Sequence, residues 1–141
     1  MKHFHRRYKR VNKWYQAACF ELIEAYVIQT DILGFYYEDA YVRLDEWGLF
    51  IIKMGFKFGA SGPTWDTKSS REGSCVHDAL YWISQQGGFG REGNEHIREQ
   101  ADHLILYLCL TNGMYRWRAN LWHKVLRVRG SKAWNKRNHK K

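Results

Sequence analysis

Residues 59–82, GASGPTWDTKSSREGSCVHDALYW, decide the fold, because strand patterns end before this stretch and helical spacing of apolar residues begins within it. Its first part, 59–73, contains three Gly, the single Pro of the chain and several Ser and Thr, all of which favour turns. Ser69 or Ser70 can cap a helix, and Glu72 stands where a capping box places an acid. Apolar side chains then recur at helical spacing, at Val76, Leu80 and Ile83. The stretch therefore predicts a loop that leads into a helix.

The sequence before this stretch carries strand patterns. Residues 25–30, AYVIQT, are rich in β-branched and aromatic side chains, and residues 40–45, AYVRLD, alternate between two faces. The turn residues 46–48, EWG, join the second segment to 49–58, LFIIKMGFKF, which predicts a β-hairpin. We therefore expect a small antiparallel sheet in the N-terminal half.

Two further helices are predicted after the stretch. Asn94 is suited to cap a helix over 95–111, and Asn112 with Gly113 is typical of a helix end. The apolar face of this helix is predicted to contain Ile97, Ala101, Leu104, Ile105 and Leu108. A third helix over 115–129 is expected to bury Trp117, Leu121, Val125 and Val128. A sheet followed by three helices, the first two an antiparallel pair, indicates an α+β fold.

Charge is distributed unevenly along the 141 residues, which carry a net charge of +9. Residues 1–13 contain six Lys and Arg and residues 115–141 contain ten, with no acid in either segment, whereas 14–114 have a net charge of −7. We therefore expect one domain over 14–130 between a basic N-terminal arm, 1–13, and a basic tail, 131–141. The sequence has no apolar run of about 20 residues and no signal-peptide pattern, which favours a cytoplasmic protein with reduced cysteines.

A candidate catalytic group is spread over the first two predicted helices. His77 and Tyr81 are four residues apart and share one helix face, and Asp102 lies at the edge of the apolar face of the next helix. If the two helices pack antiparallel, the three side chains meet beside the core. A carboxylate on one nitrogen of an imidazole fixes its tautomer, and the other nitrogen is then free to take a proton from water. The same residues equally suit a polar clasp that locks two helices together, and the spacing leaves both interpretations open.

Asp78 follows His77 but points to another side of the helix. A carboxylate in this position can bind a hard cation such as Ca²⁺ together with loop carbonyls. The sequence therefore predicts either no cofactor or, if the chain is a hydrolase, Ca²⁺ at Asp78.

Basic and aromatic residues alternate in the third predicted helix and the tail. The candidate binding residues are Arg116, Arg118, Lys124, Arg127 and Arg129. Cations between stacking rings suit nucleic acid, and they suit an anionic membrane surface equally well. The alternative is that the Trp side chains cover the core while the cations are solvated.

The combination of motifs resembles a domain family of unknown function that is common in tailed phages and prophages. The resemblance covers about 14–130 and rests on SGPTWDT (61–67), HDALY (77–81) and REQAD (98–102). It implies an α+β fold and a bacteriophage origin, in the virion, for example the tail, or in the host cytoplasm. Relatives in that family carry an Asp before the Gly that precedes the SGPT-like stretch, whereas this chain has Phe58 before Gly59.

A second resemblance is to phospholipase A2, which also pairs a helix bearing His-Asp-x-x-Tyr with an antiparallel helix bearing an Asp. By this likeness His77 is the base, Asp78 a calcium ligand, Tyr81 a supporting residue, and Asp102 the partner of His77. The flanking cysteines of the secreted enzymes and a recognisable calcium loop are missing from this sequence.

These observations lead to two hypotheses about function. The first is a non-enzymatic phage protein, virion-associated or host-interacting, that binds other phage or host proteins or another anionic partner through its basic aromatic end. The alternative is a metal-assisted hydrolase that uses His77 and Asp102. The missing acid before Gly59 and the strongly basic ends favour the first.

Overall fold

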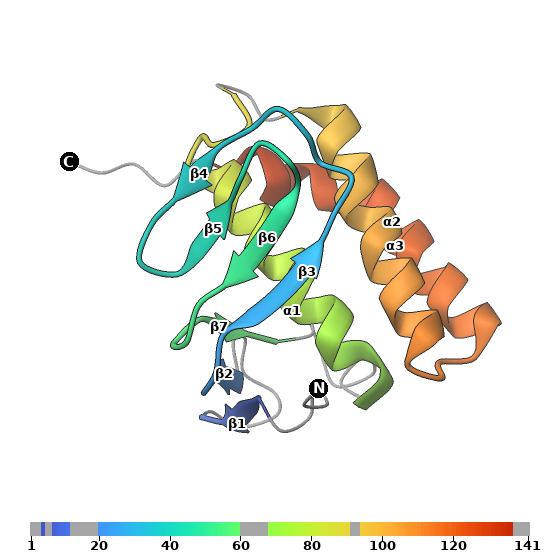
Figure 1. Ribbon diagram of the computed structural model, residues 1–141. Helices are drawn as coiled ribbons and strands as arrows, with labels where there is room; N and C mark the ends of the chain where they lie inside the picture. The colour runs from blue at the N-terminus through green and yellow to red at the C-terminus, as the bar shows by residue number, and fades with distance from the viewer. Residues whose placement is uncertain (1–3, 5–6, 12–19, 60–67, 91–93, 137–141) are drawn as a thin grey trace.

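The structure is a computed structural model that describes residues 4, 7–11, 20–59, 68–90 and 94–136. Seven short strands precede three helices in these residues, which confirms the predicted α+β fold (Figure 1). The strands are β1 (Tyr8–Arg10), β2 (Phe20–Leu22), β3 (Tyr26–Gln29), β4 (Tyr37–Glu38), β5 (Val42–Leu44), β6 (Leu49–Ile52) and β7 (Lys57–Phe58). The helices are α1 (Lys68–Gln85), α2 (Glu95–Thr111) and α3 (Arg116–Asn135).

The strands form two antiparallel sheets, one in the order β1-β2-β7 and the other in the order β3-β6-β5-β4. The predicted hairpin is confirmed as β5 and β6. Its turn is held by the Asp45 carboxylate, which accepts hydrogen bonds from the amides of Trp47 and Leu49. Gly48 has a φ of +86°, and a Cβ there would lie 2.3 Å from the Thr30 carbonyl oxygen, so this turn requires glycine.

The predicted single strand over 49–58 is wrong, because the chain turns in its middle. Gly55 has a φ of +96° and donates its amide hydrogen bond to the Leu22 carbonyl, 2.9 Å away. A residue with positive φ ends the regular extension of a strand. Residues 49–52 therefore belong to the larger sheet, and residues 57–58 form β7 in the smaller one.

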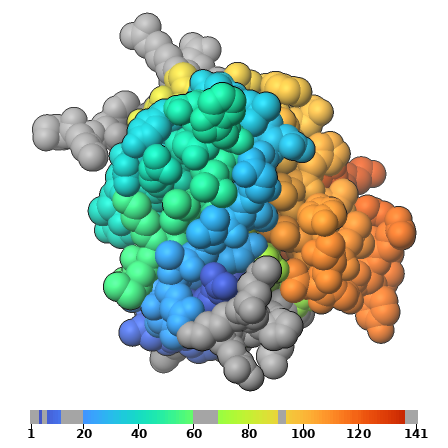
Figure 2. Space-filling model, in the orientation of Figure 1, coloured from blue at the N-terminus to red at the C-terminus, as the bar shows by residue number. Residues whose placement is uncertain are grey.

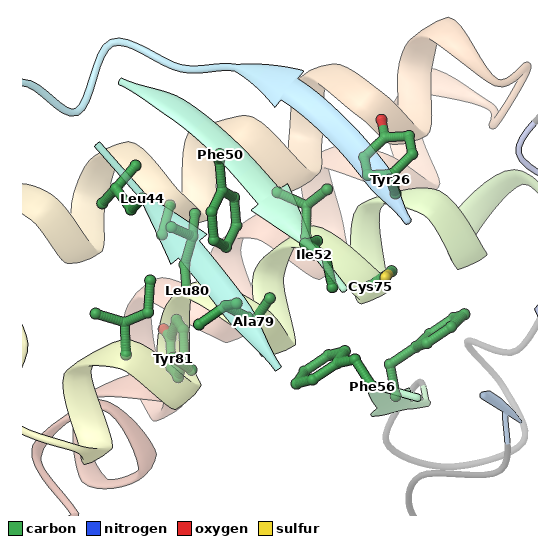
Figure 3. Close-up of a cluster of buried hydrophobic side chains, with 14 of the residues drawn as sticks. Tyr26, Leu44, Phe50, Ile52, Phe56, Cys75, Ala79, Leu80 and Tyr81 are labelled. Carbon is green, nitrogen blue, oxygen red and sulfur yellow. The ribbon is translucent and has the colours of Figure 1, made fainter. Parts of the chain in front are cut away.

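The core lies between the four-stranded sheet and α1 (Figure 3). Side chains alternate along the strands, so that Phe50 and Ile52 are buried while Leu49 and Ile51 are partly exposed. The helix presents its predicted apolar face to them, with Val76, Leu80 and Ile83 fully buried. Burial of both elements fixes which side of α1 faces away from the sheet and is free to meet the other helices.

Helices α1 and α2 pack closely and run antiparallel. Glu72, near the start of α1, accepts a hydrogen bond of 2.8 Å from Asn112, which follows the end of α2. Glu72 also accepts a hydrogen bond from the Tyr26 hydroxyl, so its side chain bridges elements instead of completing a capping box. Asn94 caps α2 as predicted, and its side chain accepts from the amides of His96 and Ile97.

Helix α3 differs from its prediction in length and in its buried face. It continues to Asn135, six residues past the expected end at 129, and Trp134 is buried. The residues that α3 buries are Ala119, Trp122, Gly130 and Trp134. Three of the four side chains predicted to be buried are instead exposed, namely Trp117, Leu121 and Val128. Gly130 explains why α3 buries this face. A Cβ at position 130 would lie 2.6 Å from the Tyr81 hydroxyl, so the glycine allows α3 to approach α1 closely.

Candidate active site

His77 and Tyr81 lie one turn apart on α1, at the edge of its buried face. Because the apolar face of α1 packs against the sheet, these two side chains point toward α2 and α3. Both are nearly buried, and their ring centroids are 4.1 Å apart. The imidazole is therefore held on one side by packing against the Tyr81 ring.

Asp102 reaches this pair from α2. One of its carboxylate oxygens, Oδ1, lies 3.0 Å from His77 Nε2 and accepts a hydrogen bond of 2.8 Å from the Tyr81 hydroxyl. Asp102 is completely buried. The structure thus brings together the three residues that the sequence predicted would meet, and it places the carboxylate on a single nitrogen of the imidazole.

The second oxygen of Asp102, Oδ2, is held by two arginines. Arg127 of α3 donates a hydrogen bond of 2.8 Å to it, and Arg98 of α2 lies 3.4 Å away. Arg98 also donates to the carbonyl of Leu126 on α3. Glu95 accepts hydrogen bonds from both guanidinium groups. One buried carboxylate therefore links all three helices. The cluster holds the helices together, and it also fixes the position of His77.

The charges around His77 favour its protonated form. Burial alone would lower the pKa of His77, but the carboxylates of Asp102 and Asp78 raise it above the usual value. Burial would likewise raise the pKa of Asp102, yet the hydrogen bonds from His77, Tyr81 and Arg127 lower it. An imidazole with a raised pKa is a stronger base than a free histidine once it is deprotonated.

A pocket of about 610 Å³ opens beside His77, between α1, α3 and the segment around β7. His77, Asp78 and Tyr81 contribute to its wall. Most of the remaining wall is apolar and consists of Phe56, Trp82, Trp122, Val125, Leu126 and Ala133. Lys57 and Arg129 add positive charge on two sides. The pocket is large enough for a small amphiphilic molecule.

Asp78 lies next to the pocket, where its Oδ1 is 3.7 Å from His77 Nδ1. Its other oxygen accepts a hydrogen bond of 3.1 Å from the Gly59 amide. The part of the chain that the structure describes contains no group of three or more His, Cys, Asp or Glu side chains that could hold a metal ion. The loop carbonyls expected beside Asp78 fall in 60–67, outside the described residues, so calcium at Asp78 stays a prediction.

Comparison with known proteins adds no family to this geometry. No family model matches the chain, and no curated protein or solved structure compared with it is significantly similar. The likeness to the phage family and to phospholipase A2 therefore stays a prediction. It rests on the motifs around His77 and Asp102 and, for the phage family, also on SGPTWDT (61–67), which lies outside the described residues.

The five predicted binding residues of α3 fall into different environments. Arg127 belongs to the Asp102 cluster, and Arg129 borders the pocket. Arg116 and Lys124 are exposed, and Arg118 is half-buried. The sequence did not predict the contacts of Arg127 and Glu95 in the Asp102 cluster, because these contacts depend on how α3 is rotated about its axis.

Within the described residues, no helix is both long enough and apolar enough to span a membrane.

Proposed function

We propose that this chain is a hydrolase in which His77 activates a water molecule and Asp102 holds the imidazole. The observation that carries the proposal is the placement of His77: Nε2 lies 3.0 Å from a buried carboxylate oxygen, Nδ1 lies 3.7 Å from Asp78, and the residue lines a pocket. Tyr81 and Arg127 fix the carboxylate, so the imidazole keeps one orientation and one tautomer. This is the arrangement that a general base requires.

The reaction is the hydrolysis of an ester. Nδ1 of His77 takes a proton from water while the water oxygen bonds to the ester carbonyl carbon, and Asp102 stabilises the imidazolium that forms. The imidazolium then gives the proton to the departing alkoxide, which leaves a carboxylic acid and an alcohol. The apolar wall around Trp82 and Leu126 favours a substrate with an acyl chain, and Lys57 and Arg129 favour one with an anionic group.

The test is hydrolysis of soluble short-chain phospholipids and simple acyl esters, with calcium and with a chelator. The His77→Asn variant should lose about 100-fold or more of the rate while its circular dichroism still shows a folded chain. His103→Asn is the matched control, because His103 is an exposed histidine of α2. The proposal is overturned if folded wild-type chain hydrolyses none of these substrates, or if folded His77→Asn retains the full rate.

A second candidate function is the binding of an anionic partner by α3, as expected of a non-enzymatic virion-associated or host-interacting phage protein. The observation that favours it is the exposure of Trp117 and Val128, at 68% and 72%, on a helix without any acidic residue. Binding through this face should weaken with added salt and with Lys124→Glu. Lys9→Glu makes the same change of charge on β1, and it should leave the binding unchanged.

A further inference from the structure

An exposed apolar stripe runs along α3 on the side opposite its buried face. We call Trp117, Leu121, Lys124 and Val128 the α3 stripe; their spacing of four, three and four residues puts them on one side of the helix. The three apolar side chains are 68%, 47% and 72% exposed. Helix α3 contains six Lys and Arg and no Asp or Glu, so the stripe combines large apolar side chains with positive charge.

A second exposed apolar patch of opposite charge lies at one end of the four-stranded sheet. The loop after β3 packs against the turn between β5 and β6, because Thr30 donates to the Gly48 carbonyl and Gly34 to the Glu46 carbonyl, both at 2.9 Å. These contacts bring together the four residues that we call the sheet-end patch: Asp31, Leu33, Glu46 and Trp47. Leu33 is 60% exposed and Trp47 is 75% exposed.

The two surfaces match in chemistry. Residues 20–59, which contain the patch, have seven acidic residues and three basic ones. Each surface therefore has one exposed tryptophan, with two aliphatic side chains beside it in the stripe and one in the patch. The charges around the stripe are positive, and those around the patch are mainly negative. An exposed apolar cluster rimmed by charge is typical of a contact site between proteins.

The two surfaces also lie on different elements, and α3 packs against α1 and α2. In Figure 1 the patch is at the end of the sheet where β5 turns into β6, whereas α3 runs alongside α2. Figure 2 shows the sheet and the helical flank as separate regions of the surface. The α3 stripe of one copy can thus reach the sheet-end patch only of another copy.

We infer that the chain associates with itself head to tail, the α3 stripe of one copy docking on the sheet-end patch of the next. The inference rests on the second candidate function, because it names the occupant of that α3 face. Two different surfaces in contact make a heterologous interface, which repeats from copy to copy and produces a ring or an open filament. The apolar side chains supply contact area, and the opposite charges set which surfaces pair.

Sedimentation velocity of the full chain over a range of concentrations tests the inference. Wild-type chain should form species larger than a monomer, and association should weaken as salt rises from about 0.05 to 0.5 M. Lys124→Glu and Glu46→Lys, each alone, should lower the association constant about fivefold or more. An equimolar mixture of the two variants should regain association, since the reversed stripe of one faces the reversed patch of the other.

Controls separate this inference from the functions proposed above. Lys9→Glu should associate as the wild type does, whereas Trp47→Ser and Trp117→Ser should both weaken association. The inference is overturned if wild-type chain is monomeric at every concentration in low salt, or if mixing the two charge variants restores nothing. If α3 variants alone lose binding to anionic vesicles or DNA and Glu46→Lys keeps it, α3 still binds an anionic partner, but that partner is not a second copy.

Discussion

Replacing Asp102 by alanine should destabilise the protein by about 3–5 kcal/mol, because the change leaves buried charge without its partner. The carboxylate is fully buried and binds His77, Tyr81 and Arg127 at 3.0 Å or less. Arg98, which is 4% exposed, would lose this carboxylate and keep Glu95 and the carbonyls of Leu126 and Arg127 as partners. Because Arg127 is one quarter exposed and regains water when the carboxylate is removed, we expect no more than the cost of one broken buried pair.

Urea unfolding followed by circular dichroism measures this loss as a shift of the midpoint at constant slope. Glu99→Ala is the matched control, because Glu99 is an acid on the same helix that is 53% exposed and 4.0 Å from Arg127. It should cost less than about 0.5 kcal/mol. A double-mutant cycle of Asp102→Ala with Arg127→Ala should show a coupling energy of about 1 kcal/mol or more.

A cost of less than about 1 kcal/mol for Asp102→Ala, a value typical of an exposed ion pair, would contradict the burial of this carboxylate. Asp102 would then be hydrated, and the three helices would be joined by their apolar faces alone. A coupling energy near zero with Arg127 would show in addition that α3 contributes nothing to the polar cluster.

Three further perturbations test other parts of the structure. Gly130→Ala should lower the free energy of unfolding by about 1–3 kcal/mol in thermal or urea unfolding, because the new methyl group would meet the Tyr81 hydroxyl. This loss is expected although alanine normally favours a helix, and adding Tyr81→Phe should relieve part of it. Trp134→Ala should cost about 3–5 kcal/mol, since Trp134 is 1% exposed and its ring stacks on Phe89; no loss would place the end of α3 outside the core. Burial would raise the pKa of Asp39, but hydrogen bonds from Trp82, Tyr37 and two backbone amides lower it. The contribution of Asp39 to stability is therefore present above about pH 4 and is lost as the pH falls through the lowered pKa. If the free energy of unfolding of Asp39→Asn declined toward acid as much as that of the wild type, this expectation would be contradicted.

Local signals explain which parts of the fold the sequence predicts. Helix α2 has its cap residue at Asn94, its apolar face and its end within one segment, and its bounds are confirmed at both ends. The contact of His77 and Tyr81 with Asp102 follows from the same information, because two helices that pack by their apolar faces bring the edges of those faces together. These predictions needed no knowledge of distant segments.

Contacts between distant segments explain what the sequence does not predict. Strands β1, β2 and β4 have only two or three residues each, and they exist through pairing with partners elsewhere in the chain. Apolar side chains occur all around α3, so its own pattern does not select a buried face. The selection comes from the fit of Gly130 against Tyr81 and Arg98, which belong to two other helices. The place of Arg127 at Asp102 depends on that fit.

The position of Trp134 and Arg127 on α3, which follows α1 and α2 in the chain, has a consequence for synthesis. Ser84 binds the Trp134 carbonyl at 2.7 Å, and Arg127 completes the cluster around Asp102, so α1 and α2 lack these partners until α3 has emerged. Domains fold as units during synthesis. The nascent chain therefore holds an incomplete core and an Asp102 carboxylate without its Arg127 partner until α3 has been made. A ribosome that stalls before Trp134 leaves a chain in which α1 and α2 cannot complete their packing.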